Sequence, residues 1–311
     1  MFFPFNLRPK PAALMVGLLL LAVPSLAACS SQGQSGGGST EATANENAIE
    51  VGILVIDNAA NTRQRYEPLI ETLSKAVGQP IVLVPLTQVS QFNEAQAGGV
   101  DFIISNPLAS VQLRRDYNTE MLATISQVGS GTEFGGVIIV PPDSAVNRVA
   151  DLEGKKGACV SLTTAAAGCL FQMYHLQQEG VNPYTGVASI TEIPSQPEIV
   201  QGVANGTLDF GFIRTGQLER MVEAGQLPSM NAVKILEPAQ DGYALPHTTR
   251  LYPTWAFSVT QTAPSDVVNQ MQQALLNIPA GDEALTSANI EQFVPPVDYS
   301  SVEEVTSAFD L

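Results

Sequence analysis

Segments with the pattern of β-strands alternate along this chain with segments of helical spacing. In the first half, runs of apolar and β-branched residues predict strands, and apolar side chains that recur every three or four residues predict helices. The expected order is a strand at 49–56, a helix over 66–77 that Gly78 ends, and strands at 81–86 and 100–105 with a short helix between them. Strands that alternate with helices indicate parallel βαβ units, and therefore an α/β fold.

The second half of the chain repeats this plan. Strands are expected at 156–161, 187–193 and 208–213, and helices over 163–179 and 197–205. Each helix is followed by a glycine, which is a common stop signal. Two α/β halves of similar order therefore follow one another in the sequence.

One local match indicates that the two halves share a module. Residues 97–106 and 205–214 both pass from Gly through Asp and Phe into an apolar strand, which then ends in polar residues. Any buried parallel strand has part of this pattern, but these two hold the same place in their halves. Because open α/β sheets bind ligands outside the carboxyl ends of their strands, two facing lobes would share one cleft and close around a ligand.

The first 28 residues have the pattern of a secretory signal peptide. Arg8 and Lys10 precede an apolar run over 12–23, which is too short to span a bilayer, and Leu26-Ala27-Ala28 leads into Cys29. With Cys at that place, the segment resembles a bacterial lipobox, which implies cleavage before Cys29 and acylation of its thiol. The alternative is an ordinary secreted protein with a chance cysteine there.

Residues 29–48 are expected to form a flexible tether between this lipid anchor and the folded part. The stretch is rich in Gly and Ser and has no apolar cluster, as is typical of flexible linkers. The fold is expected to begin near Ile49, in an extracytoplasmic position at a cell membrane or in a periplasm.

The charge and the reactive side chains exclude several classes of function. Lys and Arg number 14 against 30 Asp and Glu, a net charge of −16, which argues against nucleic acid as a partner. The two histidines, His175 and His247, belong to no catalytic motif, and no Cys-x-x-Cys spacing suggests a metal. We therefore expect neither an enzyme nor a cofactor or metal. The sequence leaves open whether Cys159 and Cys169 form a disulfide or remain two buried thiols.

Short motifs, in a fixed order, resemble a known family. They are Ser105-Asn106-Pro107, Phe134-Gly135-Gly136-Val137-Ile138-Ile139, Ala150-Asp151-Leu152-Glu153-Gly154-Lys155 and Val203-Ala204-Asn205-Gly206-Thr207-Leu208-Asp209. With the late Ala274-Leu275-Leu276, they resemble the phosphonate/phosphite-type periplasmic solute-binding proteins of ABC transporters. The resemblance extends over about residues 49–309. Ile213-Arg214-Thr215 and the segment 249–255 resemble more closely the sensor domains of histidine kinases that detect tetrathionate-like sulfur oxyanions, which share the same fold.

The resemblance implies a bilobal type II binding-protein fold, with two parallel or mixed-sheet lobes joined by two hinge crossings. The crossings are expected near 134–136 and 252–254. Lobe I would then comprise 49–135 plus 256–311, and lobe II would comprise 136–255.

The turn that follows the strand at 156–161 is the first candidate for ligand contact. Thr163 and Thr164 are expected to open a helix of small residues, and a helix N-terminus favours an anion. The turn resembles the Ser-Thr-Ser-Gly stretch that holds phosphonate oxygens in the family, but here it reads Ser-Leu-Thr-Thr-Ala-Ala from Ser161. The alternative is plain capping of the helix by Ser161 or Thr163.

Two arginines are further candidates. Arg214, followed by Thr215, is expected at the carboxyl end of a strand, where the phosphonate binders tend to carry an acidic residue. An arginine there suits a ligand with a second negative charge, because guanidinium pairs bidentately with oxyanions. Arg250 lies beside the second expected crossing. Each is equally compatible with a structural tie between lobes.

Four other residues complete the candidates. Asn106 ends the matching strand of lobe I, where its amide is able to donate to a ligand. Tyr252 and Trp255 are expected either to wall the cleft or to pack beside the hinge, and Thr62 follows the first strand.

The resemblance implies a membrane-anchored solute-binding lipoprotein. It would capture a small oxyanion of phosphorus or sulfur in the cleft, as a monomer, and deliver it to an ABC permease. The alternative is an accessory sensory lipoprotein that presents the bound oxyanion to a membrane histidine kinase.

Overall fold

The computed structural model of the chain describes residues 48–311. The predicted signal peptide, Cys29 and the predicted tether up to residue 47 lie outside the described residues. Between residues 48 and 311, no helix combines the length and the apolar character that crossing a membrane requires.

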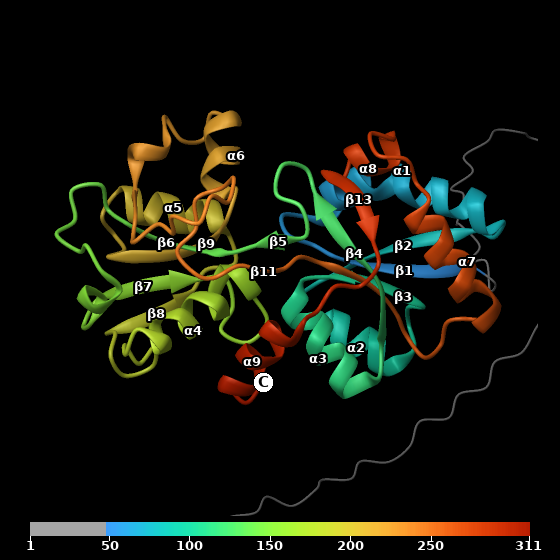
Figure 1. Cartoon of the computed structure of the whole chain (residues 1–311), viewed down its shortest axis with the longest axis horizontal. Helices are drawn as coiled ribbons and strands as arrows, with labels where there is room; N and C mark the ends of the chain where they lie inside the picture. Colours follow the sequence, from blue (N-terminus) through green and yellow to red (C-terminus); the bar gives the residue numbers. More distant parts are fainter. Residues whose placement is uncertain (1–47) are drawn as a thin grey trace, which may run out of the picture. The chain divides into compact units, whose positions relative to one another are not determined.

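The first sheet has six strands in the order β13-β4-β12-β3-β1-β2 (Figure 1). These strands are β1 (Ile49–Leu54), β2 (Ile81–Leu86), β3 (Phe102–Ser105), β4 (Glu120–Gln127), β12 (Ala256–Val259) and β13 (Ile290–Val294). β1 pairs in parallel with β2 and β3, as the βαβ pattern predicts, whereas β12 and β13 join antiparallel. The sheet is therefore mixed.

Helices cover both faces of this sheet. They are α1 (Ala59–Val77), α2 (Ser90–Ala97), α3 (Pro107–Tyr117), α7 (Ser265–Leu276) and α8 (Glu283–Thr286), and α9 (Ser300–Ala308) packs on α3. Phe102 and Ile104 of β3 face a core with α1 and α7, whereas Ile103 faces a smaller cluster with α2 and α3. This alternation follows from the two-residue period of a strand, and Figure 1 shows α1 and α8 above the sheet with α2 and α3 below it.

The second sheet has five strands in the order β10-β6-β9-β7-β8. These strands are β6 (Gly136–Val140), β7 (Lys156–Cys159), β8 (Ser189–Glu192), β9 (Phe210–Arg214) and β10 (Lys234–Ile235). β7 pairs in parallel with β8 and β9, and β6 joins antiparallel. The helices are a π-helical turn (Ala166–Leu170), α4 (Phe171–Gln178), α5 (Gln196–Ala204) and α6 (Gln217–Glu223), with 3₁₀ turns at Val149–Leu152 and Met230–Ala232. The predicted α/β class with two mixed sheets is confirmed.

A separate two-stranded antiparallel pair joins β5 (Glu133–Phe134) to β11 (Tyr252–Pro253). In the sequence, β5 stands between β4 of the first sheet and β6 of the second, and β11 stands directly before β12. Phe171 packs against Phe134 from one strand and stacks on Tyr252 from the other, at a ring-centroid distance of 3.7 Å. The chain thus passes from one sheet to the other through two hydrogen-bonded strands with a shared aromatic contact.

The matching aspartates of the two halves make equivalent hydrogen bonds. The Asp101 carboxylate accepts from the backbone N–H of Glu50 at 2.9 Å, and the Asp209 carboxylate accepts from that of Lys156 at 2.8 Å. In each lobe the aspartate therefore ties the start of its strand to the neighbouring parallel strand. The local match in the sequence reflects the same structural role twice.

The turn after β7 differs from its prediction. The strand expected at 156–161 ends at Cys159, and the helix expected to open at Thr163 begins only at Ala166. The residue before that helix is Ala165, which makes no side-chain capping bond, so neither Ser161 nor Thr163 caps it. Instead the Thr164 hydroxyl donates to the Ser161 hydroxyl at 3.0 Å within the turn.

Candidate functional site

A pocket of about 810 Å³ lies at the carboxyl ends of strands from both sheets. Leu54 ends β1, Asn106 follows β3, Val160 follows β7, and Arg214 ends β9, and all four line the pocket. This is the position that α/β sheets use for ligands, because the strand ends leave a crevice between the loops that follow them. The volume is in the usual range for small-molecule sites.

Three arginines line this pocket. Arg65 comes from α1, Arg214 from the end of β9, and Arg220 from α6. Arg65 is ion-paired with Asp57, with 3.2 Å between Nη2 and the carboxylate. Arg220 donates to the side-chain oxygen of Gln217 at 2.5 Å. Within residues 48–311, neither Arg214 nor Arg220 has an ion-pair partner.

The three guanidinium groups are close enough to influence one another. Burial first, and then the positive charges of Arg220 and Arg65, lower the pKa of Arg214 to about 9. Burial and Arg65 also lower the pKa of Arg220. Burial raises the pKa of Tyr66, which faces the same two arginines, Arg65 and Arg214, so its hydroxyl stays protonated at neutral pH. The pocket is therefore locally positive in a strongly acidic protein, and an anion would relieve the repulsion.

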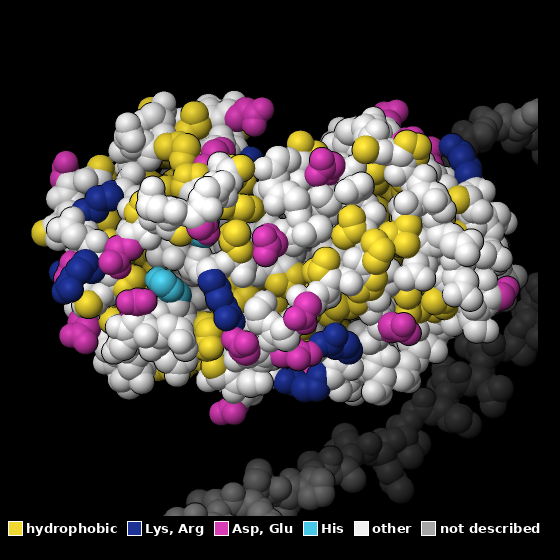
Figure 2. All heavy atoms as spheres, in the orientation of Figure 1, with side chains coloured by type: hydrophobic (Ala, Val, Ile, Leu, Met, Phe, Trp, Pro, Cys, Tyr) yellow, Lys and Arg dark blue, Asp and Glu magenta, His cyan; other side chains and the backbone are white. Residues whose placement is uncertain are grey.

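Most of the acidic residues of the protein lie outside the pocket lining. Figure 2 shows Asp and Glu side chains scattered over the visible face, among larger neutral areas. Two acidic residues line the pocket, and both are engaged: Asp57 with Arg65, and Glu192 with the backbone N–H of Leu162 at 2.6 Å. In the described part of the chain, no cluster of His, Cys, Asp and Glu has the composition of a metal site.

Asn106 and the small-residue turn form one side of the pocket. Asn106 caps α3, where its side-chain oxygen accepts from the N–H of Ala109 at 3.1 Å. Its amide donates to the carbonyl of Thr164 at 3.1 Å, which joins the two lobes. Residues 165–168 line the pocket at the N-terminal end of the π-helical turn, where free N–H groups favour an anion.

Of the residues predicted to meet a ligand, the structure brings Asn106 and Arg214 into this pocket. Trp255, expected to wall the cleft or pack beside the hinge, also lines it. The hydroxyl of Thr62 instead donates to the carbonyl of Asn58 within α1, and that of Thr215 accepts from the N–H of Gly135.

The other four predicted residues also lie outside the pocket lining. Thr163 and Thr164 lie in the turn, and their carbonyls accept from Gln112 and Asn106 of the other lobe. The Arg250 guanidinium pairs with Glu304 of α9 at 2.6 Å and lies 5.0 Å from the ring centroid of Tyr252. That ring is itself buried against Phe171. Both side chains thus make contacts within the protein, outside the pocket lining.

Five further polar residues of the pocket lining were not predicted from the sequence: Arg65, Tyr66, Gln196, Gln217 and Arg220. An available signal for Arg220 was its position six residues after Arg214, in the motif Leu218-Glu219-Arg220, which also resembles the sulfur-oxyanion sensors. Arg65 had no such signal, because arginines next to a predicted apolar helix face, as Arg63 and Arg65 are, are usually solvated.

Comparison with known proteins gives one family match over most of the chain. The family model described as "ABC transporter, phosphonate, periplasmic substrate-binding protein" matches residues 51–300.

Two curated relatives have 27% identity to this chain. One is the tetrathionate sensor histidine kinase TtrS of Salmonella typhimurium, matched over 74% of this chain and 39% of its own length. The other is the phosphate-import protein PhnD of Mycolicibacterium smegmatis, matched over 61% of this chain and 62% of its own. The chain thus spans less than two thirds of either relative.

A solved structure agrees in fold. PhnD1 from Prochlorococcus marinus, in complex with methylphosphonate, covers 85% of this chain and 98% of its own, with a TM-score of 0.68 at 14% identity. This likeness confirms the predicted binding-protein fold with its two lobes.

Proposed function

Because the chain belongs to the phosphonate-binding family of periplasmic substrate-binding proteins of ABC transporters, we propose that its pocket binds a small oxyanion of phosphorus or sulfur for delivery to an ABC permease. The observation that carries this proposal is the group of three guanidiniums in one pocket, two of them without an ion-pair partner between residues 48 and 311. Guanidinium binds oxyanions through paired N–H donors. The family is periplasmic, which makes the position of the folded part extracytoplasmic.

The charges in the pocket favour a ligand with at least two negative charges. Arg214 and Arg220 offer two cations, while Asp57 and Glu192 are already engaged. The three guanidiniums outnumber the two carboxylates in the lining, so the pocket disfavours an ammonium group on the ligand. Phosphate, phosphite, alkylphosphonates and sulfur oxyanions fit this pattern better than aminoalkylphosphonates.

A thermal-shift screen followed by calorimetric titration tests the proposal. At a hundredfold excess over Kd, a ligand of the native state is expected to raise the melting temperature by about 5–10 °C. The panel is phosphate, phosphite, methylphosphonate, sulfate, thiosulfate and tetrathionate, with 2-aminoethylphosphonate as the matched zwitterion and glycerol as the uncharged control. If no oxyanion exceeds glycerol, the proposal is wrong.

A second candidate function has one observation in its favour. The relative matched over the larger share of this chain is a tetrathionate sensor histidine kinase, not a transport protein. The same closed, liganded state serves transport and sensing, so this protein would then present its oxyanion to a separate membrane kinase. Chemical crosslinking in intact cells, with and without ligand, distinguishes an ABC permease from a histidine kinase as the partner.

The anchor on Cys29 is proposed from the lipobox-like segment before it. Cys29→Ser removes the thiol that acylation requires, so the protein is expected to move from the membrane fraction to the soluble fraction. Its oxyanion affinity should stay unchanged, because a Gly/Ser-rich segment separates Cys29 from the fold. A Cys29→Ser protein that still sediments with membranes contradicts the lipid anchor.

A further inference from the structure

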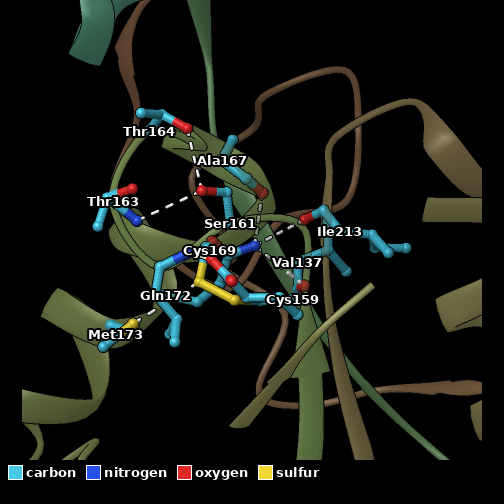
Figure 3. The surroundings of a disulfide bond; sticks show 12 residues. Val137, Cys159, Ser161, Thr163, Thr164, Ala167, Cys169, Gln172, Met173 and Ile213 are labelled. Carbon is cyan, nitrogen blue, oxygen red and sulfur yellow. Dashed lines mark hydrogen bonds between the residues drawn. A yellow bond between two sulfur atoms is a disulfide. The ribbon is translucent and has the colours of Figure 1, made fainter. Parts of the chain in front are cut away.

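A disulfide closes the segment that forms one side of the pocket. Cys159, the last residue of β7, is bonded to Cys169 in the π-helical turn, with 5.0 Å between their Cα atoms (Figure 3). Both cysteines are fully buried. The nine residues between them supply six of the pocket residues: Val160, Ser161, Ala165, Ala166, Ala167 and Gly168.

Gln172 also binds this turn, through hydrogen bonds from its side-chain amide. Its side-chain amide donates to the carbonyl of Ala167 at 2.6 Å and to that of Ile213 at 2.7 Å. Ile213 directly precedes Arg214. Figure 3 shows this amide between the turn and the strand, beside the disulfide. One buried side chain therefore connects the small-residue turn to the strand that carries the arginine.

The side chains of the turn are small, although they are buried. Residues 165–168 are three alanines in the hydrophobic core and a glycine, and Ala165 gives the helix no side-chain cap. A segment of small residues has much backbone freedom to lose, and ordering it at the moment of binding would weaken affinity. The position of the turn therefore depends on the groups bonded to it, among them the disulfide and Gln172.

We propose that the Cys159–Cys169 disulfide, together with Gln172, positions the turn 160–168 opposite Arg214 before the ligand arrives. The cysteines and Gln172 are positioning residues that act through the turn and touch no ligand. This inference rests on the proposed function of the pocket.

The proposal makes binding sensitive to reduction. A dithiol such as dithiothreitol transfers two electrons and two protons to the disulfide, which becomes two thiols, while the reductant becomes a cyclic disulfide. The loosened turn must then be ordered by the ligand, and affinity is expected to fall about tenfold.

The experiment uses the full chain in four forms. They are the oxidised protein, the protein reduced with dithiothreitol and desalted without oxygen, the reoxidised protein, and the Cys159→Ala/Cys169→Ala variant. Met271→Ala, in the core of α7 and remote from the pocket lining, is the control for lowered stability. Hydrogen–deuterium exchange without ligand reports the order of the turn, and calorimetry with phosphate, methylphosphonate and thiosulfate reports affinity.

The expected result has two parts. Exchange should rise over 160–172 in the reduced and double-alanine proteins and stay unchanged in β1 and α1, and affinity should fall about tenfold. Reoxidation should restore both, and Met271→Ala should change neither.

Three results would overturn the positioning role. They are unchanged exchange over 160–172, a looser turn with unchanged affinity, and an equal affinity loss in Met271→Ala. Failure of the oxidised protein to bind any of the three anions would count against the proposed function instead, and the exchange would still decide whether the disulfide orders the turn.

Discussion

Replacing Arg214 with alanine is expected to weaken oxyanion binding about ten- to hundredfold. The change removes a charge-assisted contact worth about 1.5–3 kcal/mol from a partly buried position. Arg214→Lys should recover only part of the affinity, because an ammonium group does not reproduce the two parallel donors of a guanidinium. Calorimetric titration with the anion that gives the largest thermal shift measures all three proteins.

Arg250→Ala is the matched control for this prediction. Arg250 is also an arginine near the chain's second crossing, but it pairs with Glu304 and lies outside the pocket lining. Its removal should leave affinity within about twofold, since a surface ion pair of this kind contributes about 0–1 kcal/mol to stability and nothing direct to the ligand.

The stability of the ligand-free Arg214→Ala protein separates a binding role from a structural one. The pKa of Arg214 in the folded protein is below its ordinary value, so folding disfavours its charged form, and this cost is present at neutral pH and relieved above about pH 9. Removing the side chain should therefore leave the melting temperature of the apo protein unchanged or slightly raised. Unchanged affinity together with a clearly lowered apo melting temperature would make Arg214 a scaffold residue.

Phe171→Ala is expected to lower the free energy of unfolding by about 3–5 kcal/mol. Phe171 is fully buried, meets the Phe134 ring edge-on at 5.8 Å and stacks on Tyr252 at 3.7 Å. Alanine would leave a cavity between the two strands that connect the sheets, because β5 and β11 hold both partner rings in place. Urea denaturation monitored by circular dichroism measures the loss.

Tyr252→Phe is the control for that change. It keeps the stacked ring and removes only the hydroxyl, so the expected loss of stability is about 0.5–1.5 kcal/mol. Since Tyr252 lies outside the pocket lining, oxyanion affinity should not change. A loss for Phe171→Ala no larger than that for Tyr252→Phe would show that the aromatic contact does not stabilise the fold.

The alternation of strands and helices could be predicted because its causes are local. Hydrophobic periodicity is a property of neighbouring residues. The helix α1 ends where expected, at Gly78, whose positive φ angle of 76° suits glycine. The Asp101 and Asp209 match was equally local, since each aspartate bonds to the strand that its own βαβ unit places beside it. The antiparallel strands that make both sheets mixed come from distant segments and carried no such signal.

The set of residues that line the pocket depends on how distant segments meet. Arg63 and Arg65 stand two residues apart on α1, yet Arg63 donates to the carbonyl of Leu83 while Arg65 lines the pocket with Arg214 and Arg220. The rotation of α1 about its axis, relative to the sheet, determines which of the two arginines faces the pocket. That rotation depends on tertiary packing and cannot be predicted from the local sequence.

Tertiary packing also explains why some of the predicted site residues line the pocket and others do not. Asn106 and Arg214 could be selected from the sequence because the carboxyl end of a parallel strand is itself a functional position in this class of fold. Tyr252 and Arg250 lie in or next to β11, where the chain passes between the two sheets. The packing of α4 and α9 around β11 directs these side chains toward Phe171 and Glu304, and away from the pocket. Short-range pattern thus determined the elements and their order, whereas the tertiary packing of lobes decided which side chains share one pocket, because that depends on contacts between residues far apart in the chain.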